Sequence, residues 1–206
     1  MLKINKVWGW AGVVAVVSLA GCSNTPIYPP APSQSTPYDW NYLVGPGDSI
    51  NVFVWRNPEV SGTFPVRPDG KMTMNLVEDM PASGKTPSQL ARDIEKALAK
   101  YIQEPIVTII VGGGVGPFDQ QIRVVGEATK PQALNYREKM SLVDLMIAVG
   151  GLTDFAAGNK AYILRTQDGK QSQLGVRLED LLKGGDIGAN VEIRPGDVLV
   201  IPESLF

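Results

Sequence analysis

The sequence predicts an α+β fold made of two small domains, at residues 41–115 and 116–206. Three observations lead to this prediction. Short runs with a period of two, rich in β-branched and aromatic side chains, recur in both halves of the chain. One stretch in each half instead has apolar residues at helical spacing behind a capping pattern. The tripeptide Pro-Gly-Asp occurs at residues 46–48 and 195–197, each time before a strand-like run.

Residues 1–21 have the pattern of a cleavable secretory signal. Two lysines precede an apolar run at residues 7–20, which is shorter than the roughly 20 residues of a membrane-spanning helix. The run ends in Leu19, Ala20, Gly21 and Cys22, which resembles the lipobox of bacterial lipoproteins at each position. An ordinary signal peptide followed by a stray or buried thiol is the alternative.

The lipobox resemblance implies a lipid anchor at Cys22. In that family the cysteine is acylated and becomes the first residue, and two or three acyl chains hold a protein on a membrane lastingly. Ser23 follows Cys22, where an aspartate would retain many such proteins at the inner membrane. The resemblance therefore implies a location at the outer membrane, lipid-anchored and facing the periplasm.

Residues 22–40 are expected to form a tether between the lipidated Cys22 and the first domain. Prolines are interspersed there with serine, threonine and glutamine, a composition that favours extended polyproline conformation over a packed core. At about 3.1 Å per residue, the tether reaches on the order of 50 Å. The alternative is that Ile27, Tyr28, Tyr38 and Trp40 pack this strip against the body or a neighbouring subunit.

The first domain is expected to begin with a turn and a strand. The turn contains Gly45, Pro46, Gly47 and Asp48, in which proline presets φ, glycine accepts a positive φ and aspartate accepts backbone N–H bonds. Residues 50–55 alternate as a strand. A hairpin is expected next, with residues 63–66 and 71–76 as its two strands around a turn that contains Asp69 and Gly70.

A helix and a strand complete the expected first domain. Thr86 is a good N-cap, Gln89 completes a capping box, and Leu90, Ile94, Leu98 and Ile102 form an apolar stripe. The apolar run at residues 106–111 suggests a strand buried on both faces. The glycine-rich residues 112–116 then suggest a hinge or loop tip at the domain boundary.

The second domain is expected to be a mixed sheet that packs on one helix. A first hairpin is predicted from strands at residues 121–125 and 131–136, with Gly126 in its connection and Pro131 at the start of the return strand. Two further strands are predicted at residues 162–166 and 171–174. The last strand is predicted at residues 198–201. A helix capped by Ser141 and Asp144 ends at Gly150 and Gly151. A last short helix is predicted at residues 176–182, and the second Pro-Gly-Asp turn is formed by Pro195, Gly196 and Asp197.

Composition excludes several classes of function. Removal of residues 1–21 takes away two lysines and no acid, so 17 basic and 21 acidic residues remain, a net charge of −4 that does not suit nucleic acid. The chain has no histidine and one cysteine. This excludes the histidine-containing catalytic triads, the usual histidine and cysteine zinc sites, and intramolecular disulfides. Neither Gly-Lys-Thr at residues 84–86 nor the glycine run at 112–116 completes a phosphate loop. No metal, cofactor or catalytic residue is therefore expected.

The motifs together resemble two known domains. Gly45, Gly47 and Asp48 with Ile50, then residues 68–70 and the capped helix, look like the polysaccharide export domain of bacterial outer-membrane exporters. Residues 125–127 with Lys130 and Pro131, the Ser141 helix ending at Gly150 and Gly151, and residues 194–198 look like the SLBB domain, a β-grasp unit. The resemblance covers about residues 42–206.

This resemblance implies a conduit rather than an enzyme. Subunits of the family assemble into a homo-oligomeric ring that conducts capsular or extracellular polysaccharide, driven by synthesis and by an inner-membrane co-polymerase that is often coupled to a tyrosine kinase. Larger members end in a membrane-spanning helix, whereas this sequence stops at Phe206. It is therefore similar to the short form, which implies that either a separate outer-membrane β-barrel completes the route or the ring works only on the periplasmic side.

Two other classes stay open on the sequence alone. A periplasmic glycan-binding lipoprotein would be favoured if Tyr136, Tyr162 and Phe155 clustered in a groove. A polysaccharide-cleaving enzyme would need two carboxyl groups that face each other about 5–10 Å apart. Glu127, Asp154 and Asp197 are available for that role, but no spacing in the sequence pairs them.

Overall fold

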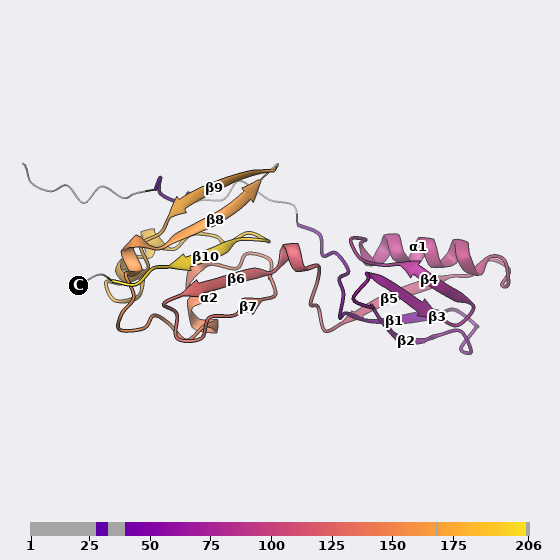
Figure 1. Ribbon diagram of the computed structural model, residues 1–206. Helices are drawn as coiled ribbons and strands as arrows, with labels where there is room; N and C mark the ends of the chain where they lie inside the picture. Colours follow the sequence, from indigo (N-terminus) through magenta and orange to yellow (C-terminus); the bar gives the residue numbers. More distant parts are fainter. Residues whose placement is uncertain (1–27, 33–39, 168, 205–206) are drawn as a thin grey trace, which may run out of the picture.

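A computed structural model describes residues 28–32, 40–167 and 169–204. It shows two α+β bodies that lie end to end (Figure 1). Each has its own core of buried hydrophobic side chains, one containing residues 44–107 and the other residues 122–201. The predicted α+β fold class is therefore confirmed.

The first body is built on a three-stranded antiparallel sheet. Strand β1 (Ser49–Val54) lies between β2 (Gly62–Pro65) and β5 (Val107–Gly112). A separate two-stranded sheet pairs β3 (Lys71–Met74) with β4 (Val77–Pro81). Both sheets contribute to one core.

The predicted hairpin around residues 68–70 is wrong. The turn itself forms, since Gly70 N–H donates to Arg67 O at 2.9 Å. The ladders, however, run elsewhere: β2 pairs with β1, and β3 pairs with β4. Sequence proximity across a good turn predicted the wrong partners, because β2 and β3 belong to different sheets.

Helix α1 (Pro87–Leu98) begins as predicted from its sequence. The Thr86 hydroxyl accepts from Gln89 N–H at 3.2 Å, and the Gln89 side chain accepts from Thr86 N–H at 3.0 Å. Its apolar stripe, Leu90, Ile94 and Leu98, is fully buried. Burial of each such side chain against the sheet stabilises the fold by about 1.5–3 kcal/mol.

The prediction that residues 106–111 form a strand buried on both faces is wrong, because β5 is buried on one face only. Ile110 is 60 % exposed, and on the adjacent strand β1 Phe53 is 47 % exposed. The alternating burial of β1 and β5 shows why: α1 packs on one face of this sheet, while the described residues leave the other face open. A run of β-branched residues does not by itself distinguish these two environments.

The second body contains a mixed five-stranded sheet. Its strands are β6 (Ile122–Gly126), β7 (Ala133–Leu134), β8 (Tyr162–Gln167), β9 (Lys170–Gly175) and β10 (Val198–Ile201). The order is β7-β6-β10-β8-β9, and β10 runs parallel to β6 while the other pairs are antiparallel. The mixed sheet and both of its hairpins agree with the prediction.

Helix α2 (Leu142–Ala148) packs on this sheet. Leu142, Leu145 and Met146 are buried in one cluster with sheet residues such as Ile163 and Leu199. The short helix α3 (Leu178–Leu182) and three 3-10 turns complete the body: η1 (Phe118–Gln120), η2 (Gly158–Lys160) and η3 (Ile187–Ala189).

Part of the expected tether lies against the second body. Ala31 N–H donates to Gly175 O at 2.9 Å, Gly175 N–H donates to Pro29 O at 2.7 Å, and the Tyr28 and Tyr162 rings lie 4.7 Å apart. Residues 28–32 thus pair with the edge of β9, as the alternative interpretation expects. The lipobox residues 19–22 and the rest of the tether outside residues 28–32 and 40 fall outside the described residues.

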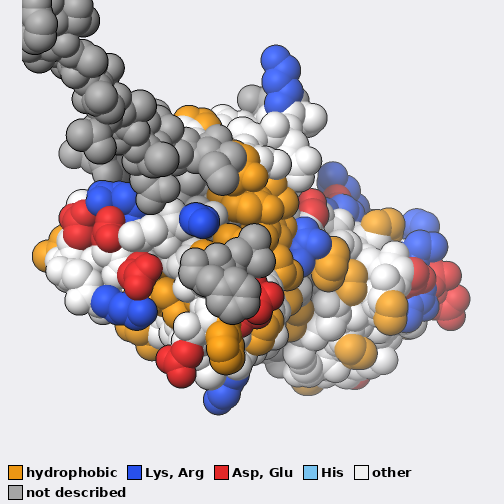
Figure 2. Space-filling model, turned by 60° about the vertical axis from the view of Figure 1, so that its left-hand side comes forward, with side chains coloured by type: hydrophobic (Ala, Val, Ile, Leu, Met, Phe, Trp, Pro, Cys, Tyr) orange, Lys and Arg blue, Asp and Glu red, His pale blue; other side chains and the backbone are white. Residues whose placement is uncertain are grey.

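Two further observations concern the surface. Among the described residues, no helix is both long and apolar enough to cross a membrane. Positive and negative side chains are interspersed on the face in Figure 2, without a broad area of either sign.

Candidate functional site

The first Pro-Gly-Asp turn holds the connection between the two bodies. The Asp48 carboxyl group is fully buried and accepts from Gly45 N–H at 2.7 Å and from the Tyr42 hydroxyl. It also accepts from Val115 N–H at 2.7 Å and Gly116 N–H at 3.2 Å. One buried side chain therefore satisfies three backbone donors, two of them in the glycine-rich connection.

The hydrogen bond with Asp48 also affects the ionisation of Tyr42. Burial, followed by the hydrogen bond and the charge of Asp48, raises the pKa of the Tyr42 phenol well above its usual value. The phenol oxygen in turn accepts from Gly116 N–H at 3.1 Å. The neutral phenol thus bridges the turn and the connection.

The second Pro-Gly-Asp turn contains a buried ion pair. Asp197 accepts from Arg165 Nε at 2.9 Å and Nη2 at 2.7 Å, and from Arg194 N–H at 2.8 Å. The side chains of Arg165 and Asp197 are 8 % and 2 % exposed. This fork-to-fork geometry fixes the start of β10 on β8.

The two turns hold opposite ends of the connection between the bodies. A Cβ on Gly196 would lie 2.6 Å from Asp119 O, so the second turn packs directly on η1. The first turn meets Val115 and Gly116. Both Pro-Gly-Asp turns therefore contact the connection between the two bodies. The glycine-rich segment is held there by hydrogen bonds from Val115 N–H and Gly116 N–H.

The other motif residues lie in turns and close contacts. Asp69 pairs with Arg67 on the surface, and this partner lowers the pKa of the Asp69 carboxyl. A Cβ on Gly126 would lie 2.0 Å from Ile201 O, which explains glycine where β6 meets β10. Gly151 N–H donates to Met146 O at 2.9 Å and closes α2. Gly70, Gly150 and Gly151 all have positive φ, and Pro131 is an exposed residue of the β6–β7 hairpin.

Two of the three carboxyl groups considered for catalysis, those of Asp197 and Glu127, have structural partners. Asp197 is paired with Arg165, and Glu127 accepts from the Thr153 hydroxyl. Within the described ranges, no group of three His, Cys, Asp or Glu residues could hold a metal ion.

The three aromatic residues considered for glycan stacking do not form one cluster. Tyr136 packs on Trp40 with ring centroids 5.0 Å apart, and Tyr162 packs on Tyr28. Phe155 is 69 % exposed.

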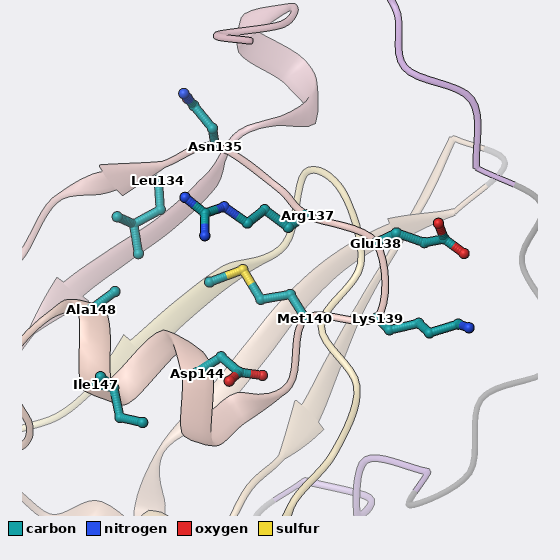
Figure 3. A pocket seen from close by; sticks show the side chains of 9 residues that line it. All are labelled: Leu134, Asn135, Arg137, Glu138, Lys139, Met140, Asp144, Ile147 and Ala148. Atoms are coloured by element: carbon teal, nitrogen blue, oxygen red, sulfur yellow. The ribbon is translucent and has the colours of Figure 1, made fainter. Parts of the chain in front are cut away.

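A groove of about 580 Å³ lies between β7 and α2 (Figure 3). Its walls include Leu134, Arg137, Met140, Asp144, Ile147 and Ala148. Figure 3 shows the Arg137 guanidinium and the Met140 thioether extending toward Leu134. The sequence does not reveal this groove, because its lining residues are scattered over 15 positions of β7, a loop and α2. The exposure of Ile147 becomes visible only in the structure.

The structure thus defines a class of protein: two α+β domains joined by a clamped connection. Comparison with known proteins identifies both domains. Residues 36–112 match the model described as polysaccharide biosynthesis/export protein, and residues 121–183 match the SLBB domain. The chain therefore carries a polysaccharide biosynthesis/export domain followed by an SLBB domain.

Curated relatives have the same theme. The chain is 25 % identical over 199 residues to the EPS I polysaccharide export outer membrane protein EpsA of Ralstonia nicotianae, a match that covers 84 % of this chain and 49 % of the relative. It is 26 % identical over 185 residues to the exopolysaccharide production protein ExoF of Rhizobium meliloti, covering 80 % and 41 %. The chain thus spans about half the length of the relatives it matches.

Proposed function

We propose that this protein is a non-catalytic subunit of a bacterial complex that exports exopolysaccharide or capsular polysaccharide. The observation that carries the proposal is the presence of an export domain and an SLBB domain, in that order, on one chain. The relatives named for exopolysaccharide export and production support it. Deletion of the gene should abolish polymer outside the cell, and the full chain should restore it. Normal export in the deletion strain would contradict the proposal.

The complex is proposed to be a homo-oligomeric ring whose lumen conducts the polymer. A ring needs one surface of each subunit to meet a different surface of the next. The open face of the β2-β1-β5 sheet supports such a contact, because Phe53, Trp55 and Ile110 are 47 %, 54 % and 60 % exposed on it. Large apolar side chains gathered on one face mark interaction surfaces.

Mass measurement of the detergent-purified chain tests the ring. Wild-type protein should form one symmetric oligomer, and Trp55→Gln or Ile110→Gln should shift it toward monomers. Ile187→Gln is the matched control, because Ile187 is 83 % exposed but lies in η3 of the other domain. A strictly monomeric wild-type protein at high concentration would rule out the ring.

The anchor is proposed to be the acylated Cys22 at the outer membrane, with the domains in the periplasm. The lipobox of residues 19–22 supports this location. Cys22→Ala should yield unprocessed or soluble protein in cell fractionation, whereas Cys22→Ala protein that is processed and fully membrane-bound would refute the lipid anchor. The push on the polymer is proposed to come from synthesis and an inner-membrane co-polymerase.

A further inference from the structure

The groove between β7 and α2 has the chemistry of a site for an amphipathic anion. Its apolar surface is formed by Leu134, Met140, Ile147 and Ala148. Arg137 lies beside this surface, and Figure 3 shows its guanidinium above the Met140 side chain. Ile147 is 73 % exposed although it is a large apolar residue on α2. The groove volume of about 580 Å³ lies within the range of small-molecule sites.

Arg137 is the charge available to a ligand. Among the described residues it makes no ion pair or hydrogen bond through its side chain. Asp144 also lines the groove, but its Oδ2 already accepts from Ser141 N–H at 2.9 Å and from the Ser141 hydroxyl at 2.6 Å. Those bonds lower the pKa of the Asp144 carboxyl. Glu138 and Lys139, the other charged residues of the rim, extend away from Arg137 in Figure 3.

The backbone on both sides of the groove is held in place. Met140 N–H donates to Arg137 O at 3.1 Å, and Met140 O accepts from Ile193 N–H at 2.9 Å. Lys139 has a φ of 61° in this tight turn, a conformation that a non-glycine residue adopts only when its surroundings impose it. Across the groove, the Gln132 side-chain amide donates to Ala148 O at 3.1 Å. A site held in this way loses little entropy when a ligand binds.

We propose that this groove binds an acidic sugar unit of a polysaccharide, with Arg137 on its carboxylate and Met140, Leu134 and Ile147 against the C–H face of its ring. The planar guanidinium matches a carboxylate with two parallel hydrogen bonds. A pyranose ring has an apolar face made of C–H groups, and a uronic acid carries its carboxylate at the ring edge. The free Oδ1 of Asp144 is placed to accept a sugar hydroxyl. The identity of the ligand rests on the proposed export function, while the site itself does not.

Calorimetric titration of the full chain in mild detergent with trigalacturonate tests the proposal. Wild-type protein should bind it saturably, and Arg137→Gln should weaken binding about tenfold or more, as expected for loss of hydrogen bonds to a charged group. Lys160→Gln is the matched control, since it removes one positive charge from an exposed residue of η2 that does not line the groove, and screening of surface charges by salt should leave affinity within about twofold. Ile147→Gln should weaken binding, while Ile187→Gln, another exposed isoleucine, should not.

The choice of probes separates the sugar from other anions. Maltotriose, which lacks the carboxylates, and triglutamate, which lacks the pyranose rings, should both bind more weakly than trigalacturonate. Triglutamate that binds as well as trigalacturonate would show a general anion or acidic-peptide site and overturn the sugar assignment. Absence of saturable trigalacturonate binding, or equal binding by Arg137→Gln, would overturn the site.

Methyl NMR supplies a second measurement of binding that does not rely on the heat of binding. The Met140 methyl signal, assigned with Met140→Leu among the six methionines, should shift on addition of trigalacturonate. A shift confined to other methionines would contradict the proposed site. Export by the complemented deletion strain reports the proposed function separately, so failure of binding and failure of the export assignment are distinguishable.

Discussion

Gly45 lies directly against the backbone of Gly116, and a Cβ on Gly45 would fall 2.0 Å from the Gly116 carbonyl carbon. Gly45 lies near the start of the first domain and Gly116 lies in the connection that follows it, so their contact sets where the connection to the SLBB domain begins. Glycine at position 45 is therefore required by space, not by backbone angle, because its φ is not in the positive region.

Gly45→Ala should destabilise the junction between the domains. The added methyl group meets backbone rather than a movable side chain, so we expect the free energy of unfolding to fall by about 1–3 kcal/mol or more. Hydrogen exchange at the amides of Val115 and Gly116 should accelerate in this variant. Gly112→Ala is the control, since its Cβ would meet only ordinary contacts at 3.5 Å and beyond. Unchanged exchange in Gly45→Ala would show that the connection can move aside.

Tyr42 should make the junction sensitive to alkaline pH. Its pKa is raised in the folded protein, so the folded state holds the phenol proton more tightly than the unfolded state does. The stability that this provides is complete below pH 10.0, the ordinary phenol pKa, and is lost as pH rises toward the higher folded-state value. Ultraviolet titration of the folded protein should show a phenol that ionises above pH 10 in the wild type and is absent from Tyr42→Phe.

Tyr42→Phe provides the control for that titration. It removes the hydroxyl that donates to Asp48, so we expect the neutral-pH free energy of unfolding to fall by about 1.5–3 kcal/mol. The part of the alkaline stability loss that belongs to Tyr42 should disappear in the variant. An identical pH profile for wild type and variant would assign the alkaline loss to other groups.

Asp197→Asn should strongly destabilise the SLBB domain. The substitution leaves the Arg165 guanidinium buried without its carboxylate, which costs about 3–5 kcal/mol for a buried pair. Urea unfolding measures this cost. Asp180→Asn breaks the exposed pair with Arg177 and should change stability little. A small effect of Asp197→Asn would indicate that water reaches Arg165.

Gly175→Val should release the segment at residues 28–32 from β9. A Cβ at this position would lie 3.2 Å from Tyr28 O, and valine adds two further methyl groups there. Limited proteolysis should then cut the chain ahead of Trp40 more rapidly than in wild type. Ser172→Val, on the same strand, is the control. Gly169→Val is unsuitable because Gly169 has a positive φ, which valine would adopt only with strain. Equal cleavage of Gly175→Val and wild type would mean that other contacts hold the segment.

Local patterns predicted local structure well. The capping box at Thr86 and Gln89, the strand after each Pro-Gly-Asp turn and the β8–β9 hairpin all form where the sequence indicates. These features depend on neighbours within a few residues, so their signals are present in a short window. The fold class and both domain resemblances rested on several such signals, and the comparisons confirm them.

Features that depend on distant partners were missed. The hairpin assigned to residues 63–76 was wrong because strand pairing depends on the whole sheet, and β2 lies beside β1 instead. The Asp48 contact with Val115 and Gly116 joins residues 67 and 68 positions apart, and no periodicity encodes it. The groove likewise depends on how the turn before α2 is placed against β7. Burial of β5 could not be read from its apolar run, since the exposed face carries Ile110.

The pairing of residues 28–32 with β9 limits how far the protein can stand from its proposed anchor. Between Cys22 and Tyr28 there are six residue steps, which span at most about 20 Å when fully extended. If Cys22 is acylated as proposed, the β9 edge of the SLBB domain can lie no farther than this distance from the membrane surface, so the segment at residues 28–32, and not the full length of residues 22–40, sets the reach of the protein.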